Sequence, residues 1–141
     1  MAKPSSRSTL YRLIEAGQLA HQALLQPLVE RGLDPGDDAI LFALNRTGIT
    51  EAALGEELGL DPNMITTRLH RLLERELIKR QAVGPELTPG LALSERGLRI
   101  RQGLADHWAQ IEEALLGELK PKHRKKLADQ LKRFIDLLSL H

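Results

Sequence analysis

The side chains best suited to chemistry are gathered in residues 61–75, which read DPNMITTRLHRLLER. If this stretch is a helix that advances about 100° per residue, its apolar side carries Ile65, Leu69, Leu72 and Leu73. The opposite side carries Asn63, Thr67, His70, Arg71 and Glu74. The flanks carry Met64, Thr66 and Arg68. The pattern predicts a helix with one apolar face and one polar, partly basic face.

Asparagine and threonine are unusual choices for the first two turns of this helix, because both are mediocre helix formers. Short side chains with donors and acceptors suit a helix that must approach the base edges of DNA closely. The alternative is a plain surface helix, which would usually be rich in Lys and Glu at these positions. The helix alone leaves the two interpretations about equal, so the elements around it have to decide.

A second short helix is expected directly before it, over residues 51–58. Thr50 can cap this helix and Gly59 can end it. We expect its inward side to carry Ala53, Leu54 and Leu58. Its outward side is acidic, with Glu51, Glu56 and Glu57, which argues against its lying in DNA. With Asp61 and Pro62 opening the next helix, the pair reads as a helix-turn-helix.

A β-hairpin is predicted immediately after the polar helix. Residues 77–83, LIKRQAV, are strand-like, GPELTPG supplies a Gly- and Pro-rich turn, and LALS returns. Lys79 and Arg80 would lie at the base of this hairpin, where a DNA backbone phosphate would pass. Ile49 could add one short strand to the sheet. A hairpin in this place is a wing, and it favours the DNA interpretation.

Helices are expected on both sides of this central region. Residues 10–31 have apolar spacings of three and four, with Pro27 near the end and Gly32 as the stop. The polar residues 1–9 before them are expected to form a mobile arm. Asp34 could cap a further helix, with Asp37 in its first turn.

Two long helices should close the chain. Ser94 can cap a helix over residues 95–119, and Pro121 opens another whose apolar residues are Leu127, Leu131, Phe134 and Leu138. Residues 120–133 hold seven cations against one acid, which could meet DNA or an anionic partner. A solvated outer face is the commoner outcome for such a run.

The composition narrows the function classes. The formal net charge is only +1, so an argument for nucleic acid must rest on local charge. No cysteine is present, which excludes disulfides and thiolate zinc sites, and the five histidines lack ligand spacing. No phosphate loop, nucleophile elbow or acid–base pair stands out. We therefore expect no enzyme, metal or cofactor, and, without a signal peptide or an apolar membrane span, a cytoplasmic location.

Three segments resemble the MarR family of winged helix-turn-helix transcriptional regulators: LDPGDDAILFAL, GITEAALGEELGLDPNMITTRLHRLLERELIKR and LALSERG. They cover residues 33–97 with suitable gaps between them. The resemblance implies a mainly α fold with a small β-hairpin wing. It divides the chain into an arm (1–9), a dimerisation helix (10–32), a DNA-binding lobe (33–96) and C-terminal dimerisation helices (97–141).

The resemblance also implies a homodimer in which the first and last helices of each chain interlock. Two recognition helices would then read successive major-groove turns of a pseudo-palindromic operator, most often to repress. The DNA-binding residues would be Asn63, Met64, Thr66, Thr67, Arg68, His70, Arg71, Lys79 and Arg80. Either a backbone contact or a structural ion pair is open to Arg71.

Two departures from the family pattern affect these expectations. The family wing usually carries Asp-x-Arg at its tip, whereas Glu86 is the only charge in GPELTPG. Minor-groove contact by the wing is therefore not expected to follow the family. His70 also stands where the family has an Asp before Arg71, which could free that arginine for a phosphate.

Family members often bind small aromatic or lipophilic effectors, and Tyr11, Arg12, His21, His107 and Trp108 could line such a pocket. Packing of Tyr11 and Trp108 at the dimer interface is the favoured alternative. Two other functions remain open: a winged-helix protein-interaction module, and a ligand-binding helical dimer with weak or no DNA binding.

Overall fold

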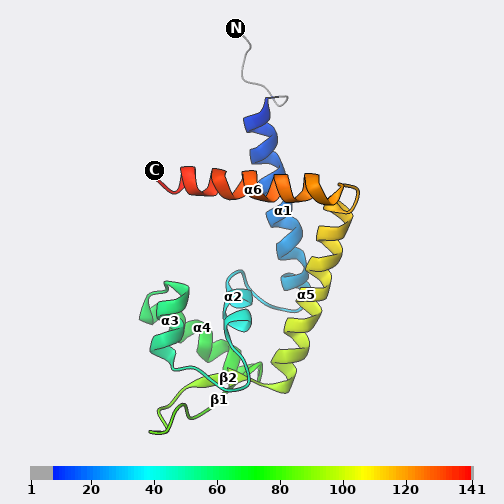
Figure 1. The fold of residues 1–141 in the computed structure, drawn as a ribbon. Coiled ribbons are helices and arrows are strands. Elements are labelled where there is room, and N and C mark those ends of the chain that lie inside the picture. The colour runs from blue at the N-terminus through cyan, green and yellow to red at the C-terminus, as the bar shows by residue number, and fades with distance from the viewer. Residues whose placement is uncertain (1–7, 141) are drawn as a thin grey trace. The chain divides into compact units, whose positions relative to one another are not determined.

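The structure is a computed structural model that describes residues 8–140. Figure 1 shows its elements, which in chain order are α1 (Thr9–Glu30), α2 (Asp37–Ala43), α3 (Glu51–Leu58), α4 (Pro62–Glu74), β1 (Ile78–Arg80), β2 (Leu91–Leu93), α5 (Glu95–Leu116) and α6 (Pro121–Leu138). The chain forms two compact units that divide within α5, between Asp106 and His107. The mainly helical fold with one hairpin confirms the predicted fold class.

The helix-turn-helix begins and ends where its capping residues predict. The Thr50 side chain accepts a hydrogen bond from the Ala53 N–H (3.2 Å), and Gly59 ends α3 with a φ of 65°. The Asp61 side chain accepts from the Asn63 N–H (2.7 Å) at the start of α4. Because each signal acts within three residues, local sequence was sufficient to place both helices.

The core of the first unit consists of leucines and isoleucines that the helices and the sheet turn toward one another. α3 packs on both α2 and α4, and β1 contacts α4. Residues that are almost fully buried include Ile40, Leu41, Leu54, Ile65, Leu69, Leu72, Leu93 and Leu104. The apolar side predicted for α4 is thus its buried side. Ala53 is exposed, so the expectation that it faces inward is wrong.

The wing is an antiparallel hairpin whose base belongs to the core. β1 pairs with β2 in the register Ile78 with Leu93 and Arg80 with Leu91. Ile49 bridges Leu91 on the other side of β2 through two backbone hydrogen bonds of 2.9 and 2.8 Å. The hairpin and the short contribution of Ile49 are both confirmed.

The start of α5 lies against residues 76–77, which join α4 to β1. The Ser94 hydroxyl accepts from the Gly97 N–H (3.0 Å) and donates to the Glu76 carbonyl (2.6 Å). A Cβ on Gly97 would clash with the Leu77 carbonyl oxygen, so only glycine allows this approach. Helix α5 ends at Leu116, three residues before the expected Leu119.

Two other boundaries differ from the sequence expectation. Ser8 caps α1 and Thr9 is its first residue, so the helix takes up the end of the expected arm, whose residues 1–7 lie outside the described residues. α2 begins at Asp37, and Asp34 does not cap it. Instead Gly36, with a φ of 99°, precedes the helix, and the Asp34 N–H donates to the Asp37 carboxylate (2.8 Å).

Each unit exposes apolar side chains on a long helix. On α1 these are Leu10, Tyr11, Ile14 and Leu19, and on α6 they are Leu127, Leu131, Phe134, Ile135, Leu137 and Leu138. No helix among residues 8–140 is long and apolar enough to cross a membrane. The exposed side chains of α1 and α6 are apolar surfaces that this single chain leaves uncovered.

Candidate nucleic-acid interface

The face of α4 that lies away from the core presents short polar side chains to solvent. Asn63, Met64, Thr66 and Thr67 are all exposed, Met64 by 53%. The buried Ile65, on the other side of the helix, fixes which way this face points. This is the exposure that contact with the base edges of DNA requires, although the contact itself stays a prediction.

The two threonine hydroxyls are already used as donors. Thr66 donates to the Pro62 carbonyl (2.8 Å) and lies 3.2 Å from the Glu51 carboxylate, while Thr67 donates to the Asn63 carbonyl (3.1 Å). Each hydroxyl oxygen keeps a lone pair. The face therefore offers acceptors at the threonines, suited to base amino groups, and an amide with both functions at Asn63.

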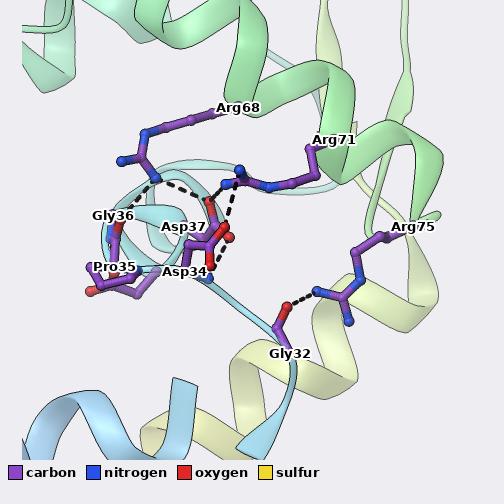
Figure 2. A network of polar contacts seen from close by, with 9 residues as sticks. Gly32, Asp34, Pro35, Gly36, Asp37, Arg68, Arg71 and Arg75 are labelled. Carbon is purple, nitrogen blue, oxygen red and sulfur yellow. Dashed lines mark hydrogen bonds and ion pairs between the residues drawn. The ribbon is translucent and has the colours of Figure 1, made fainter. Parts of the chain in front are cut away.

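Two arginines of α4 and Arg75, which directly follows it, form a row on one flank of the helix and bind residues 31–37, between α1 and the start of α2 (Figure 2). Arg68 donates to the Pro35 carbonyl (2.8 Å) and to Asp37 Oδ1 (3.2 Å). Arg75 donates to the carbonyls of Gly32 (2.6 Å) and Arg31 (3.0 Å). We call Arg68, Arg71 and Arg75 the arginine row.

Arg71, the central member of the row, binds two carboxylates. Its Nη1 lies 3.0 Å from Asp34 Oδ2, and its Nη2 donates to Asp37 Oδ1 over 2.8 Å. The expectation that His70, in place of an acid, leaves Arg71 free is therefore wrong, because the acids come from residues 34–37. Of the two alternatives for Arg71, the structural ion pair is present.

Asp37 is the centre of this network, and sequence analysis missed its role. Its side chain is 1% exposed, yet its charge is compensated by two guanidinium groups and the Asp34 N–H. A buried carboxylate needs such partners. Gly36 lies against the network, since a Cβ there would be 2.8 Å from Arg68 Nη1. The only sequence signal was two acids in a Pro-Gly turn and arginines at helical spacing.

The cations of the hairpin are placed differently. Lys79 and Arg80 on β1 are exposed, and no ion pair within residues 8–140 ties either to a carboxylate. Arg80 and His70 both line a groove between α4 and the hairpin, whose other polar residues are Glu51, Thr66 and Gln81. His70 Nε2 lies 3.3 Å from the Glu74 carboxylate, an ion pair only when the imidazole is protonated.

The tip of the wing carries no cation. Residues 84–89 are all exposed, and Glu86 is their only charge. Leu87 is 71% exposed with a φ of 54°, in the left-handed region that few non-glycine residues adopt. The tip therefore offers an acid and an apolar side chain where the family pattern would place an arginine.

The predicted effector-pocket residues lie in different units. Tyr11, Arg12 and His21 are exposed on α1, whereas His107 and Trp108 are partly buried on α5 after the division at Asp106. A pocket that joins them stays a prediction. Among residues 8–140, no group of three His, Cys, Asp or Glu side chains could hold a metal ion.

Three of the seven cations in the basic run of residues 120–133 take part in ion pairs. Arg124 lies 3.8 and 3.7 Å from Glu112 and Glu113. Lys125 and Lys132 each face an aspartate one turn ahead. These exposed pairs fit the solvated face that the sequence favoured over an anionic partner.

Comparison with solved structures places this fold among transcriptional regulators. A regulator of the MarR family from Rhodococcus sp. RHA1 matches 94% of this chain and 97% of its own, with 21% identity and a TM-score of 0.69. The PcaV regulator from Streptomyces coelicolor, solved with its natural ligand, matches 96% and 98% with 26% identity and a TM-score of 0.68. S. aureus MepR in complex with DNA matches 94% and 96% with 18% identity and a TM-score of 0.68. Neither the family models nor the curated proteins contain a match.

Proposed function

We propose that this chain, which has the fold of the MarR-family transcriptional regulators, reads double-stranded DNA in a sequence-specific manner through α4. The observation that carries the proposal is the exposed face of Asn63, Met64, Thr66 and Thr67 on the second helix of a helix-turn-helix. The exposed cations of β1 support it, because Lys79 and Arg80 lie just beyond this helix and neither forms an ion pair with an acid among residues 8–140.

We further propose that the chain acts as a homodimer on a pseudo-palindromic operator. One α4 presents only enough side chains for one half-site, and a dimer would present two at one helical turn of DNA. The apolar residues left exposed on α1 and α6 support self-association, since soluble single chains seldom leave such stripes uncovered. Repression relieved by a small effector completes the proposal, and the ligand-bound PcaV structure motivates it.

The first test is a binding titration on the DNA upstream of the chain's own gene. We expect saturable, sequence-dependent retention by the purified protein. Asn63→Ala or Thr67→Ala should weaken binding to the retained sequence by about 1–3 kcal/mol and leave binding to unrelated DNA almost unchanged. Gln22→Ala, an exposed polar change on α1, is the control and should alter neither. Unchanged operator affinity in both α4 variants would show that α4 does not read bases.

The hairpin cations should behave differently from the helix. Arg80→Ala is expected to weaken binding to all sequences and to reduce the slope of log K against log salt by about one unit per protomer, because each protomer loses one phosphate contact. Glu86→Ala at the wing tip is the matched control. The role of β1 would be rejected if the slope of Arg80→Ala equalled that of the unchanged protein.

A second candidate is a winged-helix protein-interaction module. The cation-free wing tip and the acid-bound Arg68 and Arg71 favour it, because both reduce the positive charge available to DNA. The absence of sequence-dependent retention at moderate salt would support this candidate. A ligand-binding helical dimer is the third, and a thermal-shift screen of aromatic acids with and without the retained DNA would identify it by stabilisation that DNA does not alter.

A further inference from the structure

Helix α4 presents three separate surfaces around its axis. Counting about 100° per residue from the buried Ile65, the polar face of Asn63, Thr66 and Thr67 spans about 100° to 200°. On the same count, the arginine row lies between about 240° and 300°. The row therefore borders the polar face on the side away from the hairpin. An arginine on such a flank lies near the DNA backbone when the helix enters a major groove.

The side chains of the row are only partly covered. Arg71 is 40% exposed and Asp34 is 60% exposed, whereas Asp37 is 1% exposed. The guanidinium of Arg71 thus has two different partners: Nη2 binds a buried carboxylate, and Nη1 binds a carboxylate at the surface. Only the second bond lies where a phosphate oxygen could replace the acid.

We propose that Asp34 limits the affinity of this chain for DNA, by holding Arg71 Nη1 in competition with the DNA backbone. This inference rests on the proposed function. The Asp34 carboxylate, 3.0 Å from Nη1, already compensates part of the charge of Arg71, so this guanidinium attracts a phosphate less strongly than an unpaired one would. The buried Asp37 carboxylate holds the other nitrogen of Arg71, Nη2, on the core side. We therefore expect α4 to keep its position whether or not Asp34 binds Nη1.

The consequence is that two surfaces of α4 contribute differently to DNA binding. Non-specific binding comes almost entirely from phosphate contacts, while discrimination comes from base edges. With Arg71 held by Asp34, the exposed face of Asn63, Thr66 and Thr67 contributes discrimination, and the flank contributes little general attraction. Asp34 is therefore a specificity-determining residue, although it touches no base.

The matched pair Asp34→Asn and Asp38→Asn tests this directly. Both remove one negative charge from the same stretch of chain, but the Asp38 carboxylate accepts from the Gly36 N–H and, among residues 8–140, pairs with no arginine. The probe is an unrelated duplex with no retained site. We expect Asp34→Asn to bind it several-fold more tightly at about 50 mM salt and to steepen the slope of log K against log salt by about 0.9 for each protomer on the duplex, or about 1.8 for the homodimer. Asp38→Asn should leave the slope unchanged.

Arg71 provides the second measurement. On its own, Arg71→Gln should not change the salt slope for the unrelated duplex. Combined with Asp34→Asn, it should abolish the tighter binding and the steeper slope that Asp34→Asn produces. Equal slopes for Asp34→Asn and Asp38→Asn, or a gain that survives Arg71→Gln, would overturn the inference. If the unchanged chain retains no DNA at all, the proposed function fails instead. Equal urea midpoints for the unchanged protein and Asp34→Asn confirm that folding is unaffected.

Discussion

Replacement of Asp37 by alanine tests whether the buried carboxylate is essential to the first unit. The change removes one acceptor for Arg68 (3.2 Å), one for Arg71 (2.8 Å) and one for the Asp34 N–H (2.8 Å). It leaves two guanidinium groups without their common counter-charge. It also opens the turn before α2, because that N–H has lost its partner.

The size of the effect follows from burial. Breaking a fully buried ion pair by removing one partner costs about 3–5 kcal/mol. The Arg68 and Arg71 side chains keep 27% and 40% of their exposure, so water can replace part of what they lose. We therefore expect Asp37→Ala to lower the free energy of unfolding by about 2–3 kcal/mol.

Urea denaturation followed by far-UV circular dichroism, at one fixed protein concentration, measures this loss. Asp136→Ala on α6 is the control, since its exposed pair with Lys132 should contribute less than about 1 kcal/mol. A double-mutant cycle between Asp37→Ala and Arg68→Ala should give a coupling above about 1 kcal/mol. A loss below about 1 kcal/mol for Asp37→Ala would refute the assigned role of this carboxylate.

Two further stability predictions concern the frame around the site. Gly97→Ala should destabilise the chain by about 3 kcal/mol or more, because the added methyl would meet the Leu77 carbonyl oxygen at the start of α5. A urea midpoint within error of that of the unchanged protein would contradict this prediction. Gly17→Ala is the control, since nothing lies near the methyl that it adds. Thr50→Ala should lose about 1 kcal/mol by removing the cap of α3, while Thr50→Ser should retain most of the stability.

The parts of the fold that sequence predicted are those governed by neighbours in the chain. Thr50, Gly59 and Asp61 act on groups two or three residues away, and the apolar spacing of α4 follows from helix geometry alone. The hairpin is equally local, with its strands joined by a Gly- and Pro-rich turn. In these places local preference and the final structure agree, so the prediction needed no tertiary information.

The start of α2 could not be predicted in this way. Asp34 followed by proline is a good local signal for a helix start, but the helix begins at Asp37. The deciding partners are Arg68 and Arg71, which lie 31 and 34 residues from Asp37 along the chain. Those contacts draw the Asp37 side chain inward, and the preceding residues become a turn.

The candidate interface divides along the same line. The exposure of Asn63, Thr66 and Thr67 followed from the periodicity of a single helix. Which of the nearby cations are paired did not follow from the sequence. A sequence shows which residues are cationic, but it does not show which of them are bound to acids. Arg71 and Arg80 look equivalent as letters, yet one binds two carboxylates and the other has no ion pair among residues 8–140.

The hairpin has a base that belongs to the hydrophobic core and a tip that lies outside it. Leu91, Ala92 and Leu93 of β2 are buried between β1 and Ile49, whereas every residue from 84 to 89 is exposed. Substitutions in this exposed tip have little folding free energy to remove. Apart from Gly84, whose φ of 75° favours glycine, residues of this tip can therefore change one at a time in descendants of this chain while the helix-turn-helix stays intact, without a compensating change in the core.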